Sequence, residues 1–147
     1  MEASEIIAQL PYTDPFLFVD SLIKVDENGA EGLFTFREEL TFFEGHFKDL
    51  PITPGVVLTE CCAQIGMACL GIFLARDQGL EGCMFVLSSS EMQFYTPVYP
   101  GEQVRVQSNK HYFRFRKLRC GVRMYNRKGK LVCKGILEGM QTQRFNE

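Results

Sequence analysis

The longest apolar stretch of the chain covers residues 54–75 and carries no polar stripe. An apolar surface on all sides is typical of a helix that other parts of the protein surround. Because proline suits the first position of a helix and threonine often caps it, the helix is predicted to begin at Pro54 with Thr53 as its N-cap. It is predicted to end near Arg76, with Gly79 just beyond. The pattern therefore indicates one long core helix.

A membrane span is the alternative for this stretch, because about 22 residues at 1.5 Å each reach roughly 33 Å. Three polar side chains and three glycines interrupt the stretch, and these are Thr59, Glu60, Gln64, Gly55, Gly66 and Gly71. Glu60 and Gln64 lie one helical turn apart, and polar groups at such positions are expensive in a bilayer. No second apolar run follows in the sequence. The pattern favours a core helix over a span.

Segments rich in branched and aromatic residues on both sides of this helix predict strands. Their expected ranges are residues 16–25, 33–37, 84–98, 103–115, 118–125 and 131–140. Asn-Gly within Asp26–Gly29 is a strong hairpin signal, and Asn126–Gly129 forms a second turn. Leu17, Val19, Ile23 and Val25 are expected on one face of the first strand. A change of face within residues 103–115 predicts a bulge or a bend, and residues 2–10 are predicted to form a short amphipathic helix.

This order of elements indicates an α+β fold in which an antiparallel sheet curls around one long central helix. The chain has 147 residues, of which 46% are hydrophobic. That length and composition suit a single domain with a substantial core, expected to span residues 1–147.

Charge gives no reason to expect nucleic acid or an anionic membrane as a partner, because 16 basic and 18 acidic side chains leave a net charge of −2. The six cysteines lie in apolar segments without a C-x-x-C spacing, so they are predicted to be buried and reduced. The first ten residues lack the pattern of a signal peptide, and a cytoplasmic protein is expected. Only two histidines are present, neither near a cysteine pair, so no metal or other cofactor is expected.

Glu60 and His46 are the candidate catalytic pair. A carboxyl group among apolar side chains is expected to have a raised pKa, as a general acid requires at neutral pH. His46 lies just upstream in Phe43-Glu44-Gly45-His46-Phe47 and is a candidate base. The structural alternatives are that Glu60 is merely tolerated in the core and that His46 only braces the loop or caps the helix.

Several motifs resemble those of the β-hydroxyacyl-acyl-carrier-protein dehydratases, the FabZ-like branch of the hot-dog superfamily. The histidine motif is similar to Phe43–Phe47, and the helix motif is similar to Pro54-Gly55-Val56-Val57-Leu58 through Glu60 and Gln64. Leu10-Pro11 followed by residues 15–20 resembles the opening strand of the family, and residues 97–102 resemble the turn after its third strand. The resemblance covers most of the chain, and glutamate at position 60 favours this branch over the related isomerising enzymes, which carry aspartate there.

This resemblance implies a reaction and a set of site residues. His46 would remove a proton from the carbon beside a thioester carbonyl, and Glu60 would protonate the departing 3-hydroxyl to give a trans-2-enoyl thioester and water. Backbone N–H groups near Gly55 and Val56, at the positive end of the helix, would polarise the carbonyl.

The resemblance also implies supporting residues and partners. Gln64 would support Glu60. Some of the phenylalanines would line the acyl channel, and Phe47 is the candidate among them, although such a set more often belongs to the core. The substrate would arrive on the phosphopantetheine of an acyl carrier protein. In this family the histidine and the acid come from two subunits, so a homodimer, or a larger assembly built of dimers, is expected.

The sequence departs from the family pattern at three places. Residues 48–50 replace the usual Pro-Gly, Tyr12 and Thr13 replace a His-Arg pair, and Tyr95 and Thr96 replace basic residues. Acyl carrier proteins are acidic, so another basic surface would have to receive them. The candidate is a basic strip made of Lys110, Arg114, Arg116, Lys117 and Arg119. The alternative is that this strip is simply a solvated strand face. These departures favour a specialised polyene or polyketide pathway over housekeeping fatty acid synthesis. The other histidine, His111, is expected on a strand surface without a role.

Two other functions suit the same sequence. A hot-dog thioesterase would use the helix carboxylate to hydrolyse an acyl-CoA and would not need His46. A noncatalytic acyl-chain binding module would need neither group for chemistry.

Overall fold

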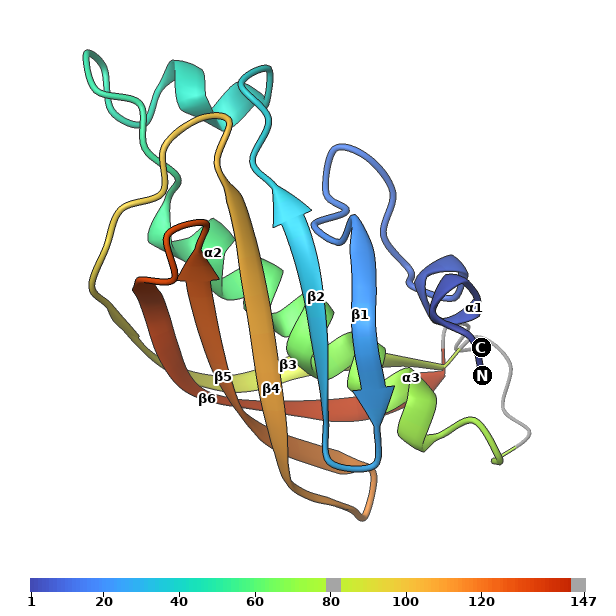
Figure 1. Ribbon diagram of the computed structural model, residues 1–147. Coiled ribbons are helices and arrows are strands. Elements are labelled where there is room, and N and C mark those ends of the chain that lie inside the picture. Colours follow the sequence, from blue (N-terminus) through green and yellow to red (C-terminus); the bar gives the residue numbers. More distant parts are fainter. Residues whose placement is uncertain (79–82, 144–147) are drawn as a thin grey trace.

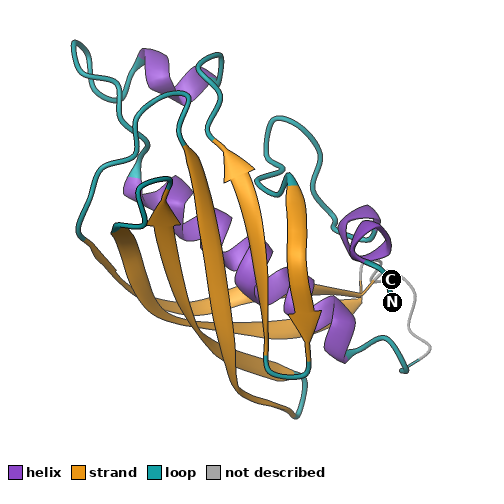
Figure 2. Cartoon of the chain, viewed as in Figure 1, coloured by secondary structure: helices purple, strands orange, loops and turns teal. Residues whose placement is uncertain are grey.

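The computed structural model describes residues 1–78 and 83–143 and contains one sheet folded around one helix (Figure 1, Figure 2). Six strands form the sheet: β1 (Ser21–Asp26), β2 (Gly29–Thr35), β3 (Cys83–Phe94), β4 (Gln103–Arg114), β5 (Lys117–Asn126) and β6 (Leu131–Gln143). Every pairing is antiparallel, in the order β1-β2-β4-β5-β6-β3. The predicted α+β fold is confirmed, and β1 and β3 form the two edges of the sheet.

The central helix is continuous but changes its winding in the middle. It comprises α2 (Gly55–Cys62), a π-helical turn η2 (Ala63–Ala68) and α3 (Cys69–Leu74). Residues 61–72 are all buried, as the all-round apolar pattern predicted. Residues 55–74 are long and apolar enough to cross a membrane, but 72% of their most apolar window is buried inside the protein. These residues therefore form the core helix of the domain, and the predicted stop at Gly79 lies outside the described residues.

Close contact between helix and sheet needs a glycine at one position. A Cβ at Gly71 would lie 2.5 Å from the Phe85 ring of β3, so a larger residue would displace that ring. All six cysteines are buried and none forms a disulfide within the described residues, as predicted, and burial raises the pKa of Cys61 and Cys69. They therefore act as small apolar side chains of the core.

The first strand was predicted at residues 16–25, and both of its ends were wrong. The chain becomes a strand only at Ser21, and residues 16–20 form a loop that packs on the helix. A register shift between Leu22 and Lys24 turns Ile23 outward, so that it is 55% exposed instead of facing the core. The hairpin turn consists of Glu27 and Asn28. Gly29 already belongs to β2, where a Cβ would overlap the Ser108 carbonyl of β4.

The other predicted elements have the expected types with shifted ends. The predicted bulge in the strand after residue 103 is confirmed, because the β4–β5 register shifts between Lys110 and Tyr112. β3 has a shift between Leu87 and Ser89 and ends at Phe94, four residues before the predicted end. Two short helices complete the fold: α1 (Ala3–Ala8), within the predicted residues 2–10, and the 3₁₀ helix η1 (Thr41–Glu44) before His46.

Candidate active site

Glu60 lies on α2, half-buried, with its carboxyl group held by one side chain. Gln64, one turn further along, donates a hydrogen bond from Nε2 to Glu60 Oε2 at 2.9 Å. Burial raises the pKa of Glu60, and the hydrogen bond from Gln64 lowers it to a smaller extent. A carboxyl group whose pKa is raised by burial keeps its proton to a higher pH than a solvated one, as a general acid requires.

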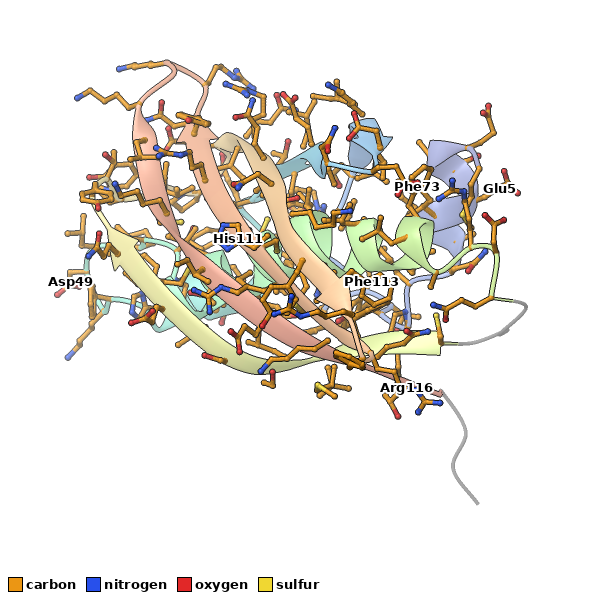
Figure 3. The ribbon with its side chains drawn as sticks, turned by 90° about the horizontal axis from the view of Figure 1, so that it is seen from below. Glu5, Asp49, Phe73, His111, Phe113 and Arg116 are labelled. Carbon is orange, nitrogen blue, oxygen red and sulfur yellow. The ribbon has the colours of Figure 1, made fainter. Side chains whose placement is uncertain are left out.

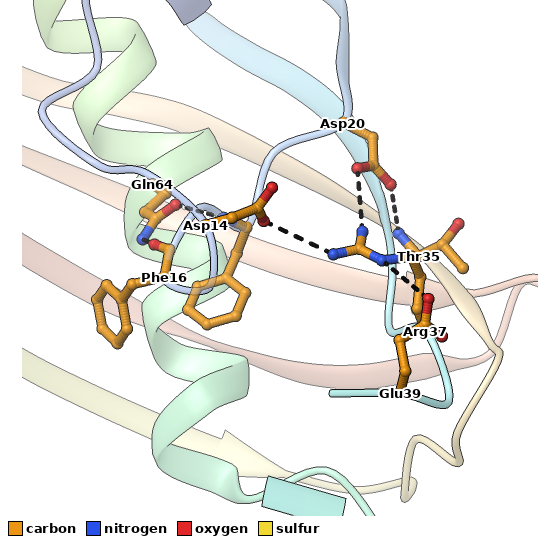
Figure 4. A network of polar contacts seen from close by, with 8 residues as sticks. Asp14, Phe16, Asp20, Thr35, Arg37, Glu39 and Gln64 are labelled. Atoms are coloured by element: carbon orange, nitrogen blue, oxygen red, sulfur yellow. Dashed lines mark hydrogen bonds and ion pairs between the residues drawn. The ribbon is translucent and has the colours of Figure 1, made fainter. Parts of the chain in front are cut away.

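Gln64 also fixes the loop between α1 and β1. Its side chain is fully buried, and it donates to the Phe16 carbonyl at 2.9 Å and accepts from the Phe18 N–H at 2.7 Å (Figure 4). At the other end of this loop, Arg37 lies within 4 Å of three carboxylates, Asp14, Asp20 and Glu39. The loop is therefore held against the helix beside Glu60. The supporting role expected of Gln64 has a geometric basis, because its side chain forms hydrogen bonds with both Glu60 and the loop.

A cavity of about 340 Å³ opens beside Glu60. Its lining is mostly apolar and comes from the first loop, the helix and the first half of β3: Pro11, Tyr12, Phe16, Glu60, Ala63, Met67, Met84, Phe85, Val86 and Leu87. Glu60 and Tyr12 are the polar side chains among the described residues of this lining. An apolar cavity with few polar groups is the usual form of a site for a small apolar ligand.

His46 lies in the loop between η1 and α2. Its Nδ1 is 3.0 Å from the Ile52 carbonyl oxygen, and the Ile52 N–H donates to the His46 carbonyl at 2.8 Å. A carbonyl oxygen only accepts hydrogen bonds, so this contact selects the neutral tautomer that has the proton on Nδ1 and the lone pair on Nε2. The ring stacks on Phe47, which is 54% exposed, with centroids 4.1 Å apart. In that tautomer, Nε2 is the nitrogen that can accept a proton.

At the start of the central helix, the N–H groups of Gly55 and Val56 have no acceptor among the described residues. The next two, of Val57 and Leu58, both donate to the Pro54 carbonyl. Val56 is 79% exposed, and the Phe94 ring packs over Gly55, where a Cβ would lie 3.4 Å from it. Free N–H groups at a helix start attract negative charge.

The expected N-cap is wrong. Pro54 occupies the cap position, while the Thr53 N–H donates to the Val98 carbonyl at 2.8 Å. The Thr53 hydroxyl is buried without a hydrogen-bond partner among the described residues. The backbone position of Thr53 is therefore set by its hydrogen bond to Val98 and not by the preference of threonine for the N-cap.

The predicted site residues fall into two groups within one chain. Glu60 and Gln64 meet beside the cavity, whereas His46, Phe47, Gly55 and Val56 gather around the helix start. None of the second group lines the cavity at Glu60, within the described part of the chain. The sequence reading missed Tyr12 as a site residue, although its departure from the family pattern was a signal.

The basic strip lies on the β4–β5 hairpin, and Figure 3 shows Arg116 at one end of the sheet and His111 nearer its middle. Lys117 and Arg119 both pair with Glu138, at 3.1 and 2.7 Å. His111 is exposed and accepts a hydrogen bond from Arg119 at 3.3 Å, so it lies on the strand surface as predicted.

Sequence comparisons with known proteins find dehydratases. Residues 22–136 match the family model described as ApeI-like, ApeI dehydratase. A curated 3-hydroxyacyl-[acyl-carrier-protein] dehydratase FabZ from Roseiflexus sp. (strain RS-1) is 34% identical over 140 residues, which cover 90% of this chain and 91% of the relative. The FabZ of Acinetobacter baylyi is 35% identical over 105 residues, 71% of this chain and 70% of the relative.

Solved structures share the fold. A chain of the dehydratase heterocomplex ApeI:P from Xenorhabdus doucetiae superposes with a TM-score of 0.80 at 16% identity, covering 95% of this chain and 91% of that one. A Streptococcus mutans protein bound to acetyl CoA gives 0.67 at 13% identity, covering 93% and 98%. On the family match and the similarity to FabZ proteins over most of its length, the chain belongs to the ApeI-like dehydratase family of hot-dog enzymes.

Proposed function

We propose that the protein removes water from 3-hydroxyacyl chains carried by acyl carrier protein and forms trans-2-enoyl thioesters. His46 takes the proton from the carbon beside the thioester carbonyl through Nε2. The electron pair left on that carbon forms the double bond as the bond to the 3-hydroxyl breaks, and Glu60 gives its proton to the departing oxygen. The departures from the family pattern favour a specialised polyene or polyketide pathway, in the cytoplasm, over housekeeping fatty acid synthesis.

The observation that carries this proposal is the carboxyl group in an apolar cavity. Burial raises the pKa of Glu60, and Gln64 holds one of its oxygens, so the other is available to a ligand in the cavity. The His46 tautomer supports the role of base, because its Nδ1 proton is engaged with Ile52. The free N–H groups of Gly55 and Val56 would stabilise the enolate-like charge on the thioester oxygen.

We propose further that two copies complete each site. β3 is an edge of the sheet with mostly exposed side chains, and such an edge can pair with a second chain. The first half of β3 lines the Glu60 cavity, while Phe94 at its end packs over Gly55 at the helix start. If two copies of β3 pair antiparallel, the helix start of one copy lies near the Glu60 cavity of the other. His46 of the partner subunit would then face Glu60.

The carrier protein is proposed to dock at the β4–β5 hairpin. Phe115 at its tip is 92% exposed, between the exposed Arg114 and Arg116. Lys117 pairs across the sheet with Met140, and Met140 pairs with Val86, which lines the Glu60 cavity. An apolar side chain among cations suits an acidic carrier, and its phosphopantetheine would reach the cavity from this side.

A coupled assay tests the reaction. Wild type, His46→Ala and Glu60→Gln are given a short 3-hydroxyacyl carrier-protein substrate, and the enoyl product is followed by absorbance. Either substitution should lower kcat on the order of a thousandfold, since each removes an acid or a base. Release of free thiol by His46→Ala would support the thioesterase alternative. Binding without turnover by wild type would support an acyl-chain binder.

A further inference from the structure

Tyr12 shares the Glu60 cavity and has no part in the mechanism above. Its ring packs against the core and lies 6.3 Å from the Phe16 ring, centroid to centroid. The loop that carries it is fixed on one side by Gln64, through Phe16 and Phe18, and the turn after it is closed by the Phe16 N–H donating to Thr13. The Tyr12 side chain is therefore held in place within the cavity wall.

Among the residues that the structure describes, the hydroxyl group of Tyr12 is a donor without an acceptor. No hydrogen bond from it is found within residues 1–78 and 83–143, and the rest of the described lining, Glu60 aside, is apolar. Burial and the nearby Glu60 raise the pKa of Tyr12 to about 12, so the group keeps its proton. A neutral donor in the wall of the same cavity as the acid favours a ligand atom that accepts a hydrogen bond there.

The reaction supplies such an atom. The 3-hydroxyl oxygen must lie at Glu60 to receive its proton, and it becomes more negative as its bond to carbon breaks. This oxygen has two lone pairs, of which Glu60 uses one. We propose that the Tyr12 hydroxyl donates a hydrogen bond to the second lone pair of the 3-hydroxyl oxygen, and so selects and activates 3-hydroxyacyl substrates. Tyr12 keeps its own proton, and the proton that completes the water comes from Glu60.

Binding of matched ligands tests this inference, which rests on the proposed dehydratase function. Turnover is blocked with His46→Ala, and Tyr12→Phe is added to that variant in the full chain. The two ligands are a short 3-hydroxyacyl pantetheine thioester and the saturated acyl thioester of the same length. Tyr12→Phe should weaken binding of the 3-hydroxy ligand about tenfold and leave the saturated ligand unchanged, because only one hydrogen bond is removed.

Kinetics provide the second readout. In the active enzyme, Tyr12→Phe should lower kcat by roughly ten- to a hundredfold, because the bond strengthens as charge develops. Tyr125→Phe is the control. Tyr125 lies on β5, where its ring packs under Arg105, and it does not line the cavity, so this variant should behave as wild type. Thermal unfolding shows whether each variant is folded.

Three results would overturn the inference. Equal weakening of both ligands would mean that Tyr12 only shapes the cavity, and no weakening would mean that its hydroxyl touches no substrate. A shifted pH profile with unchanged discrimination would mean that Tyr12 acts on Glu60 alone. These results leave the dehydratase proposal standing, whereas a wild-type protein without dehydratase activity would overturn both.

Discussion

Glu60 links catalysis to stability, because the burial that raises its pKa also opposes its ionisation in the folded protein. The folded protein holds the Glu60 proton more tightly than the unfolded chain, where the ordinary value is 4.5. As pH rises from that value through the raised one, this proton is lost and the protein loses stability. Glu60→Gln, which keeps an acceptor for Gln64, is therefore expected to be more stable than wild type at pH 7.

The stability advantage of Glu60→Gln should shrink as pH falls and vanish near pH 4, where a carboxyl group is mostly protonated in both states. Thermal unfolding of the two proteins between pH 4 and pH 8, at one protein concentration, measures this difference. Parallel curves across that range would show that the folded protein does not perturb Glu60.

Gln64 connects the acid to the first loop, and its removal should affect both. Gln64→Met keeps the side chain's size but removes three hydrogen bonds and leaves the buried Phe18 N–H without its acceptor. The expected loss is about 3 kcal/mol of unfolding free energy. The pKa of Glu60 should also rise further, since Gln64 lowers it, and this moves the alkaline limb of the pH–rate profile to higher pH.

Gln141→Met is the matched control for Gln64→Met. Gln141 is also buried and donates to Gln78 at 2.6 Å, but it does not contact Glu60. It should lower stability in denaturant unfolding without moving the pH–rate profile. If both variants leave the profile unchanged, Gln64 does not tune the acid.

Sequence spacing predicted part of the site at the residue scale. Glu60 and Gln64 are four residues apart, so one helical turn brings them together whatever the rest of the fold. The bonds from Gln64 to Phe16 and Phe18 join residues 48 and 46 positions apart, and local patterns do not contain them. The error at Thr53 has the same origin, because its N–H pairs with the distant Val98.

The β4–β5 hairpin is an element in which stability and the proposed docking conflict. Phe115 and Arg116 both have positive φ, 51° and 63°, a conformation that asparagine and glycine adopt more easily. The double variant Phe115→Asn, Arg116→Gly should gain roughly 1 kcal/mol of unfolding free energy. It should also bind the acyl carrier protein several-fold more weakly, with a weaker dependence on salt, because a cation and the exposed ring are lost.

Calorimetry of carrier binding at two salt concentrations tests the hairpin variant. Arg127→Ser in the β5–β6 turn removes a cation from the opposite end of β5 and should leave carrier affinity unchanged. A hairpin variant that binds as tightly as wild type would place the docking surface elsewhere.

Strand type was predictable and strand geometry was not. Branched and aromatic residues revealed each strand, but β1, β3 and β4 all contain register shifts. A bulge reverses the alternation of faces, which explains why Ile23 is exposed. The change of face within β4 could be predicted because apolar residues switch sides there. The sequence around the shift between Leu22 and Lys24 in β1 gave no such signal.

At the scale of the whole molecule, the all-round apolar helix and the strand segments on both sides of it together predicted a sheet wrapped around the helix. Strand order depends on long-range pairing, and β3 joins the edge beside β6 although β4 follows it in sequence. This order places β3 where a second copy can reach it. Within one chain, His46 is not among the described residues that line the Glu60 cavity, and the sequence interval of fourteen positions could not reveal this.

Complementation between two inactive variants tests whether the site is shared. In a two-fold dimer, a His46→Ala chain paired with a Glu60→Gln chain has one site with both groups intact and one with neither. When the two are co-expressed in equal amounts and pair at random, about a quarter of wild-type activity should return. If each chain held a complete site of its own, every site would lack one group and no activity would return. Light scattering on the same sample establishes whether it is dimeric, so that failure to pair is distinguished from a site within one chain.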